Sequence, residues 1–182
     1  MKILYIGFKP FASHSINPSE LLVNELIKKG HNGIILDVSY QKAKDEFEEA
    51  YEKTRPDFVV ISALSPFTSH ITLEQYAYNE MDSTQLDNDG VIKTHEAIDE
   101  SLPKSVSTTL DPFCIEQYLA SVGITSRVAI DPGRFVCNEI YFLSLNKNNK
   151  TLLVHLPLNE TRPVNENLEA FDYIDKYLQG MN

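Results

Sequence analysis

Short apolar runs alternate with amphipathic segments along the whole chain, and this alternation restricts the fold more than any other feature of the sequence. Runs of strand length occur at residues 3–7, 33–38, 58–64, 128–130 and 151–156. Apolar residues at helical spacing occur at 18–29, 43–55, 112–122, 132–143 and 164–178. Strand followed by helix, repeated, is typical of a parallel sheet covered by helices. We therefore expect an α/β fold over residues 1–182: a single-domain, three-layer α/β/α sandwich with a largely parallel (mixed) central sheet.

Capping and turn residues support these boundaries. Asn17 can cap a helix, Pro18 suits its first position, and Glu20 completes a pair resembling a capping box. Asp131-Pro132 is expected to open the helix that carries residues 135–143. Residues 71–79 are expected to be extended, and residues 81–106 are polar and irregular with a turn signal at 87–90.

The composition is that of an acidic, folded protein. Apolar residues make up 42%, charged residues 23%, and the net charge is −10. A net negative surface repels nucleic acid and anionic membranes, so we expect neither as a partner. No apolar stretch approaches the roughly 18 residues of a membrane span, and no signal peptide is recognised. We expect a cytoplasmic location.

The number and spacing of the cysteines argue against a disulfide framework and against a zinc site. Cys114 and Cys137 allow at most one disulfide, and no CxxC or Cys/His cluster indicates zinc. We expect no metal and no cofactor. Cys137 falls in the first turns of a predicted helix, where the positive helix end favours the nucleophilic thiolate. The alternative, and the commoner fate of a single cysteine, is a small buried hydrophobe.

Two further residues are candidates for acid–base chemistry. His155 lies near the end of the strand at 151–156, where the strands of α/β folds border the ligand crevice. Glu74 interrupts the apolar stretch at 71–73, and its carboxylate could orient an imidazole. A histidine satisfied at the rim of the sheet and an ordinary solvent-facing glutamate are the alternatives. Taken separately, none of the three candidates identifies an active site.

Five short motifs occur in an order and at a spacing that a known family shares. They are Gly7-Phe8-Lys9-Pro10-Phe11 with Asn17-Pro18-Ser19, Ile71-Thr72-Leu73-Glu74 with Ala77 and Asn79, Asp87-Asn88-Asp89-Gly90, Phe135-Val136-Cys137-Asn138 with Tyr141, and Val154-His155-Leu156-Pro157. Together they resemble pyroglutamyl peptidase I, also called the pyrrolidone-carboxylate peptidase family. The resemblance extends from residue 2 to about residue 178.

The resemblance implies a cysteine peptidase that removes an N-terminal pyroglutamyl group. Cys137 is then the nucleophile, His155 its base, and Glu74 the acid that orients the histidine. The implied substrate is a small peptide with a blocked N-terminus. The resemblance also implies a homo-oligomer, either a dimer or a tetramer.

The same resemblance implies a pocket for the pyroglutamyl ring, a flat neutral lactam without a free amine. Aromatic faces and backbone hydrogen bonds can hold such a ring. By resemblance, Phe8 and Phe11 line the slot, Phe135 and Val136 lie beside the nucleophile, and Leu64 contributes backbone. The alternative is that Phe8 and Phe11 are core residues at a strand end.

Several positions differ from the family pattern. Pro66-Phe67-Thr68 replaces a glycine pair and an arginine, Thr84 replaces an arginine, and Ala12 replaces a glycine. We expect side chains at 66–67 to narrow the loop beside the substrate. Arg134 replaces a small residue near Cys137 and is expected to bind substrate and to favour an acidic group near the scissile bond. Alternatively, Arg134 points to solvent and selects nothing.

These differences leave other functions open. The chain could act on another small amide, or could be a catalytically silent homologue that binds a small molecule or a partner. A nucleoside-phosphorylase-like enzyme shares the general architecture, but we find no convincing basic or glycine-rich phosphate contacts.

Overall fold

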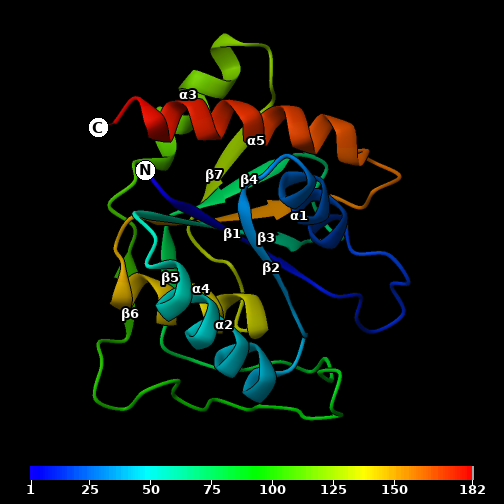
Figure 1. Ribbon diagram of the computed structural model, residues 1–182. Coiled ribbons are helices and arrows are strands. Elements are labelled where there is room, and N and C mark those ends of the chain that lie inside the picture. Colours follow the sequence, from blue (N-terminus) through cyan, green and yellow to red (C-terminus); the bar gives the residue numbers. More distant parts are fainter. Residues whose placement is uncertain (182) are drawn as a thin grey trace.

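The computed structural model describes residues 1–181 and places a six-stranded sheet between two layers of helices (Figure 1). Across the sheet the order is β2 (Asn32–Leu36), β1 (Ile3–Phe8), β3 (Phe58–Leu64), β8 (Thr151–Leu156), β4 (Ile71–Glu74) and β7 (Ser126–Ala129). The first four strands are parallel, whereas β4 runs antiparallel to β8 and parallel to β7. The expected α/β sandwich with a mixed, largely parallel sheet is confirmed.

The three central strands explain the long apolar runs in the sequence. Every residue of β1, β3 and β8 is buried. A strand that is covered on both faces reads as a nearly continuous apolar run, because neither face meets water. Ser62 is the polar exception in β3, and its hydroxyl donates a hydrogen bond to the Ile6 carbonyl at 3.0 Å.

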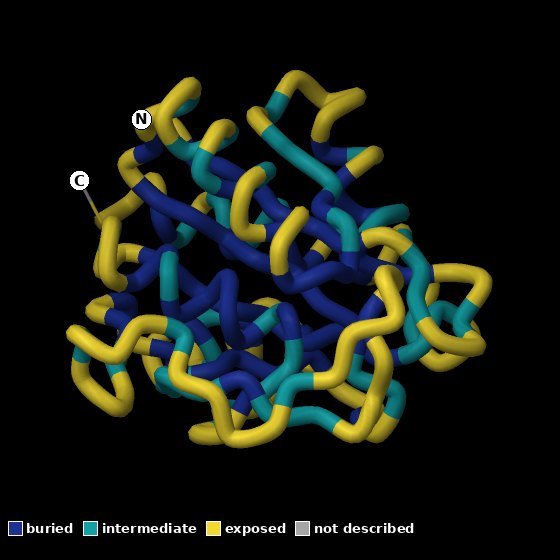
Figure 2. Tube along the Cα trace, turned by 90° about the horizontal axis from the view of Figure 1, so that it is seen from below, coloured by how far each residue is buried: buried dark blue, intermediate teal, exposed yellow. Residues whose placement is uncertain are grey.

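The helices cover the two faces of the sheet in separate groups. α1 (Pro18–Lys28), α3 (Pro112–Ser121) and α5 (Val164–Gln179) lie on one face, and α2 (Tyr40–Thr54) and α4 (Val136–Lys147) lie on the other (Figure 1). Figure 2 shows buried segments through the centre and exposed loops around them. Within the described residues, no helix is both long and apolar enough to cross a membrane.

The sequence signals at two helix starts are seen in the structure. The Asn17 side chain accepts a hydrogen bond from the Ser19 N–H, and Pro18 is the first residue of α1. Asp111 caps α3 by accepting from the N–H groups of Phe113 and Cys114. Each cap satisfies backbone donors that the first helical turn leaves without an intrahelical partner.

α4 begins later than the sequence predicts. The prediction placed its start at Asp131-Pro132, but the helix begins at Val136, and its N-cap residue Phe135 makes no side-chain cap hydrogen bond. Asp131 instead accepts a hydrogen bond from the Gly133 N–H, and Gly133 has a φ of 79°. Because the Asp131 carboxylate is bonded within this turn, it does not cap the helix. Residues 131–134 therefore form a loop, and the helix starts beside Cys137.

The predicted extended segment at 71–79 divides into two strands. β4 ends at Glu74, and β5 (Tyr76–Tyr78) pairs with β6 (Ser105–Ser107) in a small separate sheet. β6 lies within the stretch predicted to be irregular, since three mostly polar residues give no periodic signal. The strands predicted at 33–38 and 128–130 are observed at Asn32–Leu36 and Ser126–Ala129.

Candidate active site

Cys137 is the second residue of α4 and lies beside His155. Its Sγ is 3.6 Å from His155 Nε2. The first N–H groups of a helix have no intrahelical carbonyl to bond, and no side chain caps this turn. The sulfur therefore lies at an electropositive helix end, an environment that favours a thiolate.

His155 is the next-to-last residue of β8, at the edge where the central parallel strands end. It is 7% exposed, so its ring is almost fully enclosed by protein. Its Nδ1 lies 2.9 Å from Oε1 of Glu74, while its Nε2 faces the Cys137 sulfur. The ring thus connects the carboxylate to the thiol.

Glu74 reaches His155 because of the antiparallel register between β4 and β8. Thr72 is paired with His155, so Glu74 is a diagonal neighbour on the same face of the sheet. Glu74 is 2% exposed, and its backbone carbonyl accepts a hydrogen bond from the Tyr141 hydroxyl at 2.8 Å. The end of β4 is therefore held in place from the α4 side, which fixes the position of the carboxylate.

The electrostatics of this group favour an imidazolium. Burial lowers the pKa of His155, but the hydrogen bonds to Cys137 and Glu74 and the charges of both partners outweigh it and raise the pKa well above its usual range. Glu74 at one ring nitrogen and Cys137 at the other stabilise the protonated ring through hydrogen bonds and charge. The arrangement is suited to a thiolate–imidazolium pair that a carboxylate orients.

A cavity of about 620 Å³ opens onto these three side chains. Phe11, Leu64 and Phe135 line it together with Glu74, Cys137 and His155. A volume of this size accommodates a short peptide or a small amide. Of the cavities described, this one contains the complete Cys–His–Glu group.

A small apolar slot adjoins the thiol and communicates with that cavity. It has a volume of about 30 Å³, and all of the predicted ring-pocket residues line it with Cys137: Phe8, Phe11, Leu64, Phe135 and Val136. The Phe11 and Phe135 ring centroids are 5.7 Å apart. Phe11, Leu64 and Phe135 line both spaces, so the slot opens beside the main cavity and shares these walls with it.

The structure does not bring Arg134 into either space, so the prediction that it binds substrate gains no support from the geometry and stays a prediction. Its guanidinium lies 3.8 Å over the Tyr78 ring, and it pairs with Glu80 at 3.2 Å and with Asp131 at 2.6 Å. Two carboxylates and an aromatic face already satisfy this cation. The alternative stated from the sequence, that Arg134 selects nothing, fits this position, although the side chain is held by these partners and does not point freely into solvent.

A different guanidinium, that of Arg127, lines the main cavity and was not singled out from the sequence. Arg127 lies on β7, directly opposite Thr72 of β4, and its Nε donates to the Thr72 hydroxyl at 3.3 Å. It forms no ion pair among the described residues. The register of β4 with β7 places Arg127 here, and strand pairing between distant segments leaves no local sequence signal.

Four of the unusual loop positions also border the main cavity: Ala12, Pro66, Phe67 and Thr84. Ala12 has a φ of 54°, the left-handed region that favours the glycine expected there by resemblance. Pro66 and Phe67 also line the cavity, where a glycine pair would offer no side chains, and Phe67 is 97% exposed. The predicted narrowing of the loop by side chains at 66–67 stays a prediction.

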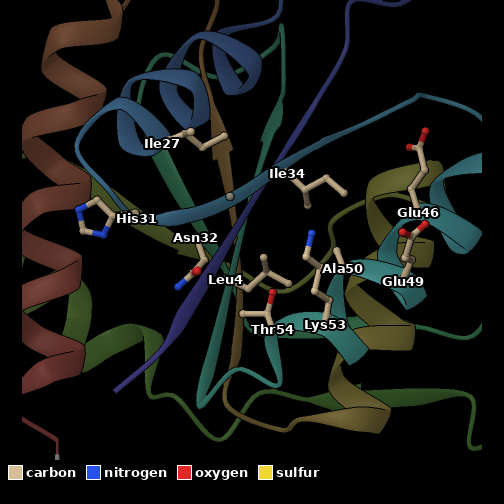
Figure 3. A pocket seen from close by; sticks show the side chains of 11 residues that line it. Leu4, Ile27, His31, Asn32, Ile34, Glu46, Glu49, Ala50, Lys53 and Thr54 are labelled. Atoms are coloured by element: carbon tan, nitrogen blue, oxygen red, sulfur yellow. The ribbon is translucent and has the colours of Figure 1, made fainter.

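Another cavity and a cluster of acidic residues with a histidine lie elsewhere on the surface, and neither contains the Cys–His–Glu group. A cavity of about 410 Å³ beside the edge strand β2 is lined by side chains from α1, β2 and α2, and neither cysteine reaches it (Figure 3). Glu80, Asp82 and His95 present ligand atoms within 4.8 Å of one another, a spacing that could hold a metal ion. Glu80 already pairs with Arg134 and His95, and none of the three lines the cavity at Cys137.

Comparison with known proteins gives one consistent result. A protein-family model described as pyroglutamyl peptidase matches residues 1–158. The pyrrolidone-carboxylate peptidase of Pyrococcus furiosus is 34% identical over 151 residues, which cover 80% of this chain and 73% of the relative. That of Thermococcus litoralis is 30% identical over 176 residues, covering 91% of this chain and 80% of the relative.

Solved structures agree with the sequence matches. The pyrrolidone carboxyl peptidase of Fervidobacterium islandicum AW-1 superposes with a TM-score of 0.94 at 28% identity and covers 99% of each chain. A pyrrolidone carboxyl peptidase structure from Pyrococcus furiosus gives a TM-score of 0.92 at 26% identity over 100% of each chain. Both structures have an architecture similar to the one described here.

Proposed function

The chain belongs to the pyroglutamyl peptidase family and is a cysteine-type omega peptidase; from this premise we propose that Cys137, His155 and Glu74 are the residues that remove an N-terminal pyroglutamyl group from a peptide. One observation carries the assignment. The chain of contacts from Glu74 through His155 to Cys137 ends at the mouth of an aromatic slot. A nucleophile and a ring pocket therefore adjoin each other.

The first half of the reaction forms a thioester. The Cys137 thiolate attacks the carbonyl carbon that joins the pyroglutamyl ring to the next residue, and the carbonyl oxygen takes the negative charge. His155 then donates its Nε2 proton to the leaving nitrogen, the C–N bond breaks, and the shortened peptide departs with a free amine. Glu74 holds the ring in the orientation that aims Nε2 at the sulfur and the leaving group.

The second half regenerates the thiolate. His155, which has lost its Nε2 proton, now takes a proton from a water molecule. The hydroxide that results attacks the thioester carbonyl. The C–S bond breaks, pyroglutamate leaves, and the thiolate–imidazolium pair forms again. No oxidant, metal or cofactor enters this balance.

The start of α4 supplies electrostatic stabilisation for both tetrahedral intermediates. The N–H groups of Val136 and Cys137 open the helix, where no intrahelical acceptor competes for them. Donors that are already in place when the oxyanion develops are worth about 2.7–4 kcal/mol each in hydrolases of this kind. The late start of α4 therefore matters, because it brings these donors next to the sulfur.

The pyroglutamyl ring packs at the mouth of the slot that Phe8, Phe11 and Phe135 line, and the leaving side extends into the main cavity. Apolar walls suit a neutral lactam, which offers no charge for an ion-pair clamp. On the leaving side, Arg127 is a cation without an ion-pair partner among the described residues. We assign to Arg127 the preference for acidic leaving groups that the sequence assigned to Arg134.

The test is hydrolysis of a fluorogenic pyroglutamyl amide by the purified protein. Turnover by the wild type and none by Cys137→Ala supports the proposal. Turnover that survives in Cys137→Ala, or cleavage of unblocked aminoacyl amides at the same rate, would contradict it. Cys114→Ala is the matched control, because Cys114 is an exposed thiol on α3, remote from the cavity in the contacts it makes.

We also propose that the enzyme acts in the cytoplasm and self-associates. Both cysteines are free thiols, and the cytoplasm is a compartment that keeps thiols reduced. The family resemblance supports self-association as a dimer or a tetramer. Sedimentation velocity over a concentration series checks it, and a single monomeric species at every concentration would refute it.

A further inference from the structure

A second polar cavity lies on the side of α4 that faces away from the thiol. It has a volume of about 280 Å³ and is enclosed by α2, the segment at 81–98 and α4. Its polar walls include Tyr40, Lys44 and Glu139, and its apolar walls include Met81, Val91 and Ile98. None of these residues takes part in the reaction described above.

Glu139 is the most unusual residue of this cavity. It is 4% exposed, and its Oε2 has no hydrogen-bond partner among the described residues. A buried carboxylate without a partner is costly, because it loses its hydration without compensation. Burial raises the pKa of Glu139 to about 8, with Lys44 and Lys93 opposing this shift and Asp87 adding to it.

Tyr40, which also lines this cavity, carries a second unpartnered polar atom. It is 4% exposed, and its hydroxyl has no hydrogen-bond partner among the described residues. Buried polar atoms are nearly always paired in native proteins, so two without a protein partner at one cavity mark it as a place where a polar ligand can bind. The cavity is several times the volume of a water molecule, about 30 Å³ in the liquid, so it can hold more than solvent bridging two atoms.

The other charged groups of the cavity are already satisfied, with one exception. Asp87 accepts hydrogen bonds from the backbone N–H groups of Tyr40, Asp89 and Val91, and Asp89 accepts from Ser39 and Lys42. Lys93 pairs with Glu96. Lys44 forms no salt bridge among the described residues, so the free polar groups are a carboxyl, a phenol and an ammonium.

These groups define the occupant by complementarity. A ligand ammonium pairs with Glu139 and the Tyr40 hydroxyl, a ligand carboxylate pairs with Lys44, and an apolar side chain packs on Met81, Val91 and Ile98. We propose that this cavity binds a free amino acid with an apolar side chain. The class of ligand rests on the proposed function in one respect: removal of pyroglutamate from a dipeptide releases a compound of this kind.

The site is separate from the catalytic thiol but adjoins its surroundings. Cys137 and Glu139 are two residues apart on α4, which places their side chains about 200° apart around the helix. Tyr40 packs edge-on against Phe135, with ring centroids 5.8 Å apart, and Phe135 lines the ring slot. An occupant of the second cavity therefore contacts the reverse side of the wall that receives the pyroglutamyl ring.

L-leucine is the probe, and binding is measured on protein whose Cys137 has been alkylated with iodoacetamide, so that no turnover is needed. We expect L-leucine at ten times its Kd to raise Tm by about 3–5 °C. N-acetyl-L-leucine, which lacks the ammonium, is expected to have no effect. In isothermal titration at pH 7 the binding should release protons to the buffer, because pairing with the ammonium ionises Glu139.

Glu139→Gln is expected to abolish the response to L-leucine, and Glu116→Gln, a half-buried glutamate on α3 that does not line this cavity, is the matched control that keeps it. If Glu139→Gln does not fold, Tyr40→Phe provides the same test and should weaken binding at least tenfold. The proposal is overturned if the alkylated wild type shows no binding heat, if N-acetyl-L-leucine binds equally, or if the variants bind as the wild type does. Because the readout is binding to inactive protein, a failure here is distinguishable from a failure of the peptidase assay.

Discussion

Replacing Glu74 with glutamine removes one negative charge from beside His155 while leaving an oxygen that can accept the Nδ1 proton. The contact is 2.9 Å long, and both side chains are buried. A hydrogen bond to a charged group contributes about 1.5–3 kcal/mol, and one between neutral groups about 0.5–1.5 kcal/mol. The change therefore weakens the imidazolium by about 1–1.5 kcal/mol, which corresponds to about a tenfold loss of kcat/KM.

The weaker stabilisation of the His155 imidazolium in Glu74→Gln can also be measured independently, from the pH dependence of the activity. The raised pKa of His155 means that the imidazolium persists at neutral pH and is lost as the pH rises through that pKa. Removing the Glu74 charge lowers this pKa, so the alkaline limb of the kcat/KM profile should move to lower pH by about one unit. Because the resting ring carries protons on both nitrogens, the amide of glutamine must present its oxygen to Nδ1.

The assay is the pH profile of pyroglutamyl amide hydrolysis by wild type, Glu74→Gln and the control Glu116→Gln, whose side chain does not line the main cavity. Wild-type activity with an unmoved alkaline limb in Glu74→Gln would refute the role given to Glu74. A loss as complete as that of His155→Ala would refute the magnitude, since it would mean that the carboxylate does more than orient the ring.

Three more outcomes are expected. Iodoacetamide should label Cys137 rapidly below pH 7 and Cys114 slowly, because the hydrogen bond to Asp111 raises the pKa of the Cys114 thiol; equal, slow rates for both thiols would contradict this. His155→Ala should abolish nearly all turnover, measured with the fluorogenic amide, because the thiolate loses its counter-ion and the leaving amine loses its proton donor; retained turnover would rule out His155 as the proton donor. Arg134→Thr should leave the ratio of kcat/KM for pyroglutamyl-Glu and pyroglutamyl-Ala unchanged, whereas Arg127→Gln should lower it about tenfold; the reverse pattern would return the specificity role to Arg134.

The sequence predicted those parts of the molecule that depend on local pattern. Buried strands such as β3 read as apolar runs, and Asn17-Pro18 predicted the start of α1 correctly. The three candidate catalytic residues were recognised through motifs in a shared order. Their contacts follow from the antiparallel pairing of β4 with β8, which no single motif reveals.

The errors arose where a distant segment decides the local outcome. The sequence also did not reveal that Tyr78 and Glu80, from a segment more than fifty residues away, bind the Arg134 guanidinium. Arg127 was overlooked because its exposure to the cavity depends on pairing between β7 and β4. Asp131 resembled a helix cap, but its carboxylate is used within its own turn, so α4 begins only at Val136.

The central claim is that Cys137 attacks a carbonyl whose ring lies in the adjoining aromatic slot. The most direct test is covalent labelling with pyroglutamyl chloromethyl ketone, followed by peptide mapping by mass spectrometry, with and without excess 2-pyrrolidone to occupy the slot. The account predicts a single adduct on Cys137, formed more slowly when 2-pyrrolidone is present. An adduct on Cys114, no adduct at all, or labelling of Cys137 at the same rate in the presence of the lactam would contradict it.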